Sequence, residues 1–83
     1  MPEIDRMHVF VLAYNRRQAE DFIQQHGIKT IGKYISSIED IQGYNPKFVD
    51  VYRLPSWDKH PNSVDIMDEL TYRNFKIKDW EEV

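Results

Sequence analysis

The sequence contains no cysteine, and this absence removes several chemistries at once. Disulfide frameworks, thiolate nucleophiles and the common structural zinc sites all depend on cysteine, so none of them applies to this chain. A chain without disulfides suits a reducing compartment. We therefore expect a cytoplasmic protein.

Long apolar runs and a secretory pattern are also lacking. The longest apolar run, residues 9–14, is far shorter than the roughly 20 residues that cross a bilayer. Residues 1–6 do not have the charged, apolar and small-residue regions of a secretory signal. We expect neither a membrane protein nor an exported one.

Glycine is scarce, with three in the chain, and neither of the glycine-rich phosphate-loop motifs occurs. We therefore expect no nucleoside triphosphate hydrolysis and no cofactor. The histidines, His8, His26 and His60, lack the i, i+4 spacing of helical metal ligands, so we expect no metal site. Ser56, Asp58 and His60 do not predict a hydrolytic relay, because three close neighbours in one loop rarely reach that geometry.

Positive charge is too sparse for general nucleic-acid binding. The net charge is −3, and residues 35–83 carry six Lys/Arg against ten Asp/Glu. Binding to nucleic acid needs a row of cations that neutralises phosphates. The acidic side chains of residues 65–69 and 79–82 indicate a solvated surface, or a docking surface for a basic partner.

The length and composition predict one folded domain over residues 1–83. With 41% hydrophobic residues the chain is ordinary for a globular protein, although 83 residues build only a small core. We expect the core in residues 7–74, with residues 75–83 as a C-terminal arm or edge strand. A homo-oligomer would add buried surface to so small a protein.

The clearest local signal lies at residues 7–19. Residues 7–13 form an unbroken apolar run, which predicts a central strand covered on both faces. Asn15 is a suitable N-cap and Gln18 completes a box with it, so a helix begins here. Gly27 predicts the end of that helix.

The rest of the chain alternates strands and helices. We expect strands at residues 29–35 and 47–54, the second beside the first strand of the chain, and a short helical turn with a Ser36–Glu39 capping box. A second helix begins at Asn62 or Ser63 and ends at Asn74, and its apolar positions are Val64, Met67 and Leu70. This order predicts an α/β fold: a small, mainly parallel sheet of three or four strands, two main helices and a short helical turn, without a phosphate loop.

Polar and aromatic residues follow the predicted strands at their carboxyl ends, where open α/β sheets bind ligands. Arg16 and Arg17 stand in the first turn of a helix, where the helix dipole disfavours cations by roughly 0.3–1 kcal/mol each. A bound phosphate or carboxylate would offset that cost; alternatively both are solvated and screened by Glu20 and Asp21. The candidate ligand-binding residues are Tyr14, Asn15, Arg16, Arg17, Ser36, Arg53 and Trp57.

Each tryptophan has two interpretations. Trp57 stands between Ser56 and Asp58, so it is either an exposed binding anchor or a loop side chain folded over the end of the sheet. Trp80 packs the C-terminal arm either on its own sheet or on a partner subunit.

Several short motifs occur along the chain: residues 9–12, the Asn15-Arg16-Arg17-Gln18-Ala19 turn, Gly27, residues 34–36, the turn at 41–43 and residues 52–57. Together they resemble small bacteriophage α/β proteins of no firm activity. The resemblance spans residues 7–72 and implies a Rossmann-like sheet of the kind found in helicase halves. It also implies a protein that acts by binding in the cytoplasm of a host cell.

These observations favour a binding protein over an enzyme. We expect it to bind a host protein or a phosphorylated, nucleotide-like ligand at the strand carboxyl ends. Two alternatives stay open: a small metal-dependent hydrolase or nuclease acting through Asp58, and a structural subunit that assembles through residues 75–80.

Overall fold

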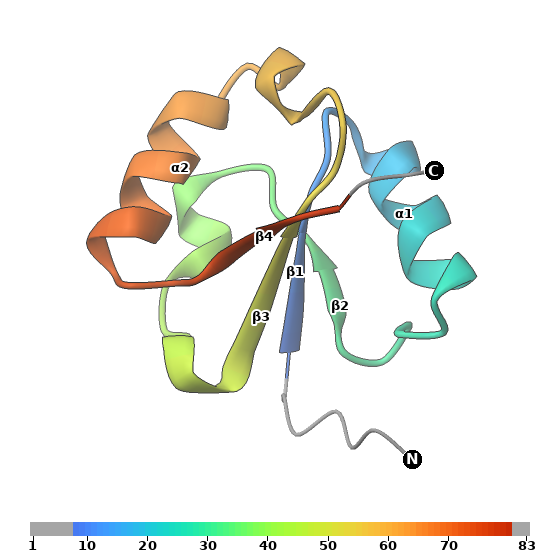
Figure 1. The fold of residues 1–83 in the computed structure, drawn as a ribbon, viewed down its shortest axis with the longest axis horizontal. Helices are drawn as coiled ribbons and strands as arrows, with labels where there is room; N and C mark the ends of the chain where they lie inside the picture. Colours follow the sequence, from blue (N-terminus) through green and yellow to red (C-terminus); the bar gives the residue numbers. More distant parts are fainter. Residues whose placement is uncertain (1–7, 81–83) are drawn as a thin grey trace.

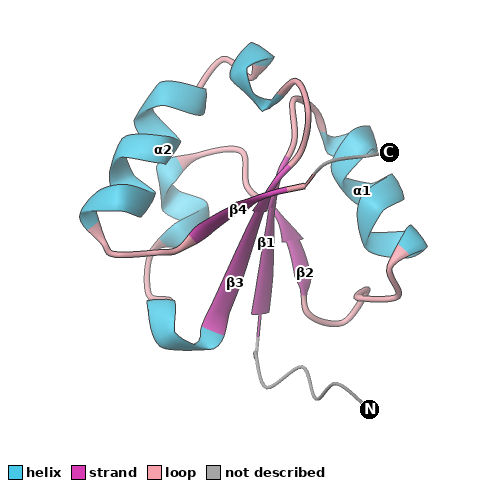
Figure 2. Ribbon diagram, in the orientation of Figure 1, coloured by secondary structure: helices cyan, strands magenta, loops and turns pink. Residues whose placement is uncertain are grey.

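Four parallel strands form the centre of the fold in a computed structural model that describes residues 8–80 (Figure 1). The strands are β1 (His8–Leu12), β2 (Gly32–Tyr34), β3 (Val49–Arg53) and β4 (Ile77–Asp79), in the order β2-β1-β3-β4. Helices α1 (Arg16–Gln25) and α2 (Ser63–Tyr72) lie on opposite sides of the sheet (Figure 2). The predicted α/β class with a small parallel sheet is confirmed.

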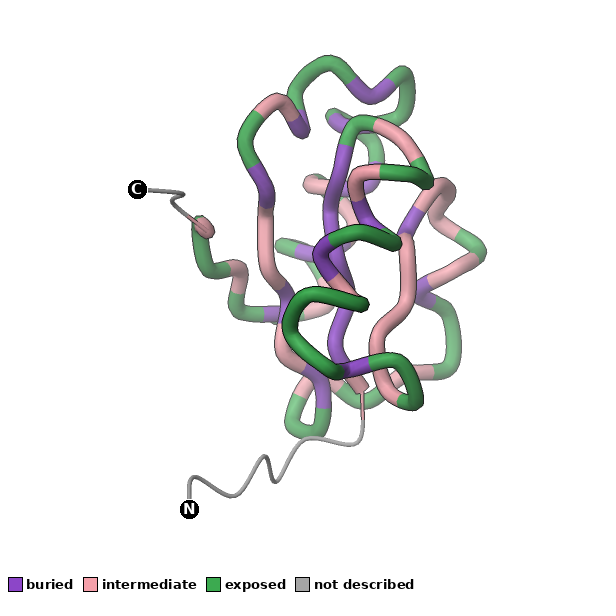
Figure 3. The backbone as a smooth tube through the Cα atoms, turned by 90° about the vertical axis from the view of Figure 1, so that its right-hand side faces the viewer, coloured by how far each residue is buried: buried purple, intermediate pink, exposed green. Residues whose placement is uncertain are grey.

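Strand β1 is central, as its unbroken apolar sequence predicts. It pairs with β2 on one side and with β3 on the other, and residues 9–12 are buried (Figure 3). Phe10 and Leu12 pack on the side of α2, whereas Val9 and Val11 pack on the side of α1. Burial of each such side chain contributes about 1.5–3 kcal/mol, so β1 supplies both halves of the core.

Helix α1 begins and ends at the residues that the sequence indicates. The Asn15 side chain accepts a hydrogen bond from the Gln18 N–H at 2.8 Å, and Gly27 follows the helix with a positive φ of 65°. The return bond differs from a capping box, because the Gln18 Oε1 accepts from the Tyr14 N–H instead of the Asn15 N–H. Gln18 therefore fixes the chain one residue before the cap.

The predicted Ser36–Glu39 capping box is wrong by one residue. The turn is a 3-10 helix, Ile38–Ile41, whose N-cap is Ser37. The Asp40 carboxylate accepts from the N–H groups of Ser36 and Ser37 at 2.8 and 3.1 Å, while Glu39 is exposed. The shift arises because Ile41 must be buried, and that orientation directs Asp40 back to the start of the turn.

Strands β2 and β3 are shorter than the sequence predicts. The Ile28 carbonyl accepts from the N–H groups of Ile31 and Gly32, so residues 29–31 form a turn and β2 starts at Gly32. A Cβ on Gly32 would lie 2.8 Å from that same carbonyl oxygen, which explains glycine at this position. A 3-10 helix, Pro46–Phe48, precedes β3 and takes the first residues of the predicted strand.

Helix α2 packs on the core through only part of the apolar face that the sequence predicts. It begins at Ser63 and is followed by Asn74 in a left-handed conformation, as expected. Ser63, Ile66 and Leu70 are buried, but Val64 is 71% exposed. Leu70 is buried and Met67 packs against the core as predicted, whereas Ile66 takes the place of Val64.

The C-terminal segment forms an edge strand, as one of the two predictions for it states. β4 pairs with β3 in parallel, so α2 crosses over one face of the sheet between them. The 3-10 segments between β2 and β3 lie on the same face as α2, whereas α1 lies on the other (Figure 1). Neither helix within residues 8–80 has the length and apolar character needed to cross a membrane.

Candidate functional site

The order of the strands reverses between β1 and β3. The chain leaves β1 toward α1 on one face and leaves β3 toward α2 on the other, so the two connections diverge at the carboxyl ends. In open parallel sheets, ligands bind in the crevice at such a reversal. The candidate site therefore lies around residues 13–16 and 54–57, near the top of Figure 1.

The side chain of Gln18 connects the loop after β1 with the loop after β3 and so closes the crevice between them. Its Nε2 donates to the Pro55 carbonyl at 3.2 Å, and its Oε1 accepts from the Tyr14 N–H at 3.1 Å. Tyr14 and Asn15 thus contribute to the start of α1, Tyr14 through its N–H and Asn15 as the cap. The Tyr14 side chain is 43% exposed. From the sequence, only a capping role could be predicted for Gln18, since its second partner is 37 residues away.

The first turn of α1 is cationic. It contains no acidic residue, and neither Arg16 nor Arg17 forms an ion pair within residues 8–80. Both arginines are exposed, and Arg16 places its guanidinium over the Tyr34 ring, 5.4 Å from the centroid. Glu20 and Asp21 therefore do not pair directly with the two arginines. The ring of Tyr34 instead stabilises the positive charge of Arg16 through a cation–π contact.

A hydrogen-bonded chain of polar groups connects β2 with the start of α2. The Asn62 N–H donates to Nδ1 of His60 at 3.0 Å, so the imidazole proton resides on Nε2, which donates to the Tyr34 hydroxyl at 3.1 Å. Burial lowers the pKa of His60 and raises that of Tyr34, although the charge of Arg16 opposes the second shift. Both side chains are therefore neutral near pH 7.

Ser36 belongs to this end of the sheet but acts within its own turn. Its Oγ and N–H both donate to the Asp40 carboxylate, and its carbonyl accepts from the Asn62 side chain at 3.0 Å. Burial raises the pKa of Asp40, but the hydrogen bonds from Ser36 and Ser37 outweigh it and hold that pKa below its usual range. Ser36 is thus already engaged by groups of the protein.

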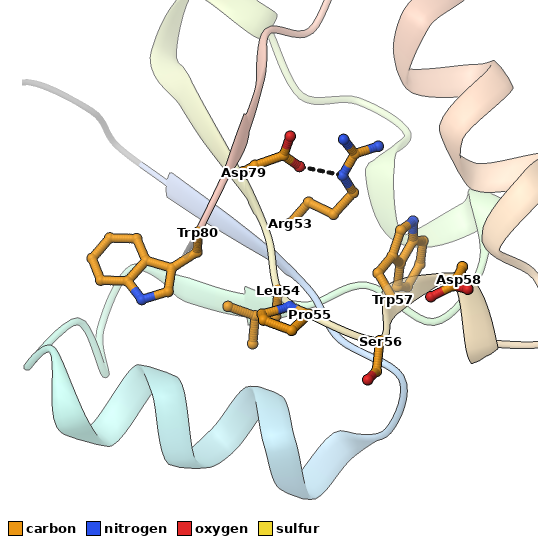
Figure 4. A pocket seen from close by; sticks show the side chains of 8 residues that line it. All are labelled: Arg53, Leu54, Pro55, Ser56, Trp57, Asp58, Asp79 and Trp80. Atoms are coloured by element: carbon orange, nitrogen blue, oxygen red, sulfur yellow. Dashed lines mark hydrogen bonds and ion pairs between the residues drawn. The ribbon is translucent and has the colours of Figure 1, made fainter. Parts of the chain in front are cut away.

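A cleft of about 600 Å³ lies at the carboxyl ends of β3 and β4 (Figure 4). Its volume falls within the roughly 300–1,000 Å³ that is usual for small-molecule sites. It brings together Arg53 and Trp57, two of the residues that the sequence singles out. The lining residues are Arg53, Leu54, Pro55, Ser56, Trp57, Asp58, Asp79 and Trp80.

Arg53 and Asp79 form an ion pair across the last residues of β3 and β4 (Figure 4). The bond runs from Nε of Arg53 to Oδ1 of Asp79, and the terminal nitrogens of Arg53 have no hydrogen bond within residues 8–80. The hydrogen bond from Arg53 lowers the pKa of Asp79, and in return the carboxylate raises the pKa of Arg53. The guanidinium is thus held in place with donors left for another partner.

Trp57 is a buried side chain, 3% exposed, so it is not an exposed anchor. It packs in the core between the sheet and α2, which confirms the interpretation of a loop side chain folded over the sheet. Its indole Nε1 has no hydrogen-bond partner in the described chain, and Figure 4 draws this atom at the end of the ring nearest the Arg53 side chain. A buried donor without a partner is costly, by about 1–3 kcal/mol.

Trp80 packs on its own sheet, as one of the two interpretations states. Its ring meets those of Phe22 and His26 edge-on, with centroids 5.0 and 4.6 Å away, and it also contacts Tyr52. Trp80 thereby packs the end of the C-terminal segment against helix α1, on the face of the sheet opposite α2. On the other side of the end of β3, Ser56 has a positive φ of 72°, an unusual conformation for a residue other than glycine.

Comparisons with known proteins identify no relative of this chain. No family model, curated protein or solved structure matches the chain. Within residues 8–80 no three His, Asp or Glu side chains gather in a way that could hold a metal ion. The resemblance to bacteriophage proteins stays a hypothesis.

The structure separates the predicted ligand-binding residues. Arg53 and Trp57 meet in the cleft, whereas Arg16 joins Tyr34 in a second pocket between α1 and β2. Tyr14, Asn15 and Arg17 stay at the start of α1, and Ser36 lies in the turn after β2. The sequence missed Asp79, Tyr34 and His60 as members of this region. Only the position of each just before or after a predicted strand or helix pointed to them.

Proposed function

We propose that the protein binds a small phosphorylated ligand at the carboxyl ends of β1 and β3. The observation that carries this proposal is the cleft in which Trp57 Nε1 and the terminal nitrogens of Arg53 lack partners within the described chain. Donors of this kind, held in a concave site, are typical of a ligand-binding protein.

The start of α1 supplies the place for the phosphate. Arg16 and Arg17 add two positive charges to the free N–H groups of a first turn that has no acidic residue. Helix starts of this kind favour anions through both their N–H groups and the helix dipole. The hydrogen bond from Gln18 to Pro55 joins this turn to a loop that lines the cleft, while the Arg16 guanidinium itself faces Tyr34 of β2.

The same arrangement favours binding over catalysis. Asp58 and Asp79 are the two carboxylates of the cleft, and Asp79 is already paired with Arg53. A metal-dependent hydrolase needs convergent ligands, and a general base needs a free, suitably placed acceptor. A Rossmann-like ancestry from a bacteriophage would agree with a binding role, and we keep it as part of this proposal.

The test is a calorimetric titration with ribose 5-phosphate and the nucleoside monophosphates as probes. We expect the double variant R16Q/R17Q to lose binding while its unfolding curve stays unchanged, because both side chains lie outside the core. The matched control K47Q/K76Q removes two positive charges at the amino ends of β3 and β4 and should bind normally. Binding that survives in R16Q/R17Q, or no binding of any probe by the unaltered protein, contradicts the proposal.

A further inference from the structure

The cleft at the ends of β3 and β4 is separate from the start of α1. The Arg16 guanidinium faces Tyr34 in a pocket between α1 and β2, and that pocket shares no lining residue with the cleft. The hydrogen bond from Gln18 to the Pro55 carbonyl closes the crevice between the two places. A ligand in the cleft must therefore be recognised by the residues of the cleft alone.

Two donors of the cleft lack an acceptor. Trp57 is 3% exposed and lines the cleft, and its indole Nε1 has no hydrogen-bond partner within residues 8–80. This atom lies at the end of the ring nearest the Arg53 side chain, whose terminal nitrogens also make no hydrogen bond in that part of the chain (Figure 4). A carboxylate accepts several hydrogen bonds at once and pairs with a guanidinium more strongly than a neutral acceptor does. These donors therefore favour a carboxylate.

The fold holds both donors in place before a ligand binds. The register of β3 against β4 sets Arg53 opposite Asp79, and the bond between Nε and Oδ1 fixes the guanidinium. The Trp57 N–H donates to the Leu54 carbonyl at 3.2 Å, across a turn in which Ser56 has a φ of 72° and a ψ of 11°. These angles belong to the third position of a type II turn, which favours glycine. Strain of this kind is typically kept at binding sites, and ordered donors lower the entropy cost of binding.

The charges of the cleft are a poor match for a carboxylate alone. Among the lining residues, all of which lie within residues 8–80, Arg53 is the one cation and Asp58 and Asp79 are two carboxylates. Asp79 bonds Arg53 through Oδ1, and its Oδ2 makes no hydrogen bond in the described chain. A ligand that added only negative charge would be repelled by these carboxylates. The ligand therefore needs a cationic donor next to its carboxylate.

We infer that the cleft binds a free α-amino acid, with its carboxylate at Arg53 and Trp57 and its ammonium group at Asp79. The two charged groups of an α-amino acid are attached to one carbon, so they lie side by side, as the donors of Arg53 and Oδ2 of Asp79 do. This inference goes beyond the proposed function, because it gives the cleft a ligand of its own that carries no phosphate.

The rest of the lining indicates the kind of side chain. Leu54, Pro55 and Trp80 give the cleft apolar surface, and its volume of about 600 Å³ leaves room for a side chain beside the two charged groups. Small-molecule sites combine such apolar walls with a few polar groups that fix the orientation of the ligand. The cleft therefore favours an amino acid with an apolar side chain.

Calorimetric titration of the complete chain with L-leucine and L-phenylalanine tests the inference. We expect at least one of them to bind about tenfold or more tightly than two analogues with the same side chain, one without the ammonium group and one without the carboxylate. For L-leucine these analogues are 4-methylpentanoate and 3-methylbutylamine. R53Q should weaken binding about tenfold or more, because it removes the charged donor. The matched control R73Q also breaks an Arg–carboxylate pair, with Glu69 of α2, and should bind normally.

The Trp57 indole N–H signal in NMR gives a second readout, which should shift at saturation because the donor gains an acceptor. Binding of neither amino acid, an analogue that binds as tightly as its parent, a fixed indole signal or unchanged affinity in R53Q overturns the inference. If R53Q unfolds, D79N decides, because it keeps the shape of the side chain and should abolish the preference for the amino acid over its analogue without ammonium. A preference that survives in D79N also overturns the inference. These probes carry no phosphate, so the proposed function stands or falls on its own test.

Discussion

The imidazole Nε2 of His60 lies 3.1 Å from the hydroxyl oxygen of Tyr34, and this hydrogen bond joins the loop before α2 to the last residue of β2. His60 is 6% exposed, and its other nitrogen accepts from the Asn62 N–H. A proton on Nδ1 would break that second bond. The fold at this end of the sheet therefore depends on a neutral histidine.

The first prediction concerns pH. Because burial lowers the pKa of His60, the folded and unfolded chains both carry a neutral imidazole above its usual pKa of about 6.5. As the pH falls below that value the unfolded chain takes up the proton first, so the free energy of unfolding decreases until the folded pKa is reached. Urea unfolding between pH 8 and 5 measures this decrease.

Two variants isolate the contribution of His60. H60Q should lose about 1–3 kcal/mol of stability at pH 8, because its partners are left unsatisfied, and should lose the pH-dependent decrease as well. H26Q removes a histidine at the end of α1 and should keep that decrease. A decrease of the same size in H60Q would assign the titration to another group.

The second prediction distinguishes the two acidic residues of the first 3-10 turn. D40N removes the charged acceptor of three hydrogen bonds from Ser36 and Ser37, so it should lower the free energy of unfolding by about 1–2 kcal/mol at pH 7. E39Q alters an exposed carboxylate and should change it by less than about 0.5 kcal/mol. Chemical denaturation measures both. A larger loss of stability in E39Q than in D40N would instead support the Ser36–Glu39 capping box that the sequence predicts.

That misplaced cap shows where sequence reasoning ends. Asn15, Gln18 and Gly27 act through neighbours a few residues away, so the sequence predicts α1 closely. The choice of Asp40 over Glu39 depends on which residue of the turn is buried by the rest of the fold, and a local pattern does not contain that information.

The candidate site shows the same division. Gln18 meets Pro55 across 37 residues, and His60 meets Tyr34 across 26. Trp57 has polar neighbours in sequence and no helical or strand periodicity, yet the sheet and α2 enclose it. The strand carboxyl ends were predictable as a region, whereas the pairing of Arg53 with Asp79 required the register of β3 against β4.

The third prediction concerns the conformation of Ser56. Its φ of 72° lies in the left-handed region, which costs a residue with a Cβ about 1–2 kcal/mol. S56G should therefore raise the free energy of unfolding by roughly 1 kcal/mol, and S56V should lower it, because a β-branched residue tolerates this region least. Thermal unfolding of the two variants gives the comparison. Equal melting temperatures would mean that the loop adopts another conformation in solution.

The most direct test of the account is an amide NMR titration of the ¹⁵N-labelled chain with a nucleoside monophosphate. We predict shifts of the amides of Arg16, Arg17 and Ser56, which belong to the proposed site. The Trp57 indole N–H signal should shift as well, because this buried donor has no partner within residues 8–80 and lies on the Arg53 side of the ring (Figure 4). Amides at the amino ends of the strands, such as those of Val49 and Lys76, should not move. Shifts confined to those amino ends, or a Trp57 indole signal that stays fixed at saturation, would contradict the claim that ligands bind at the carboxyl ends of β1 and β3.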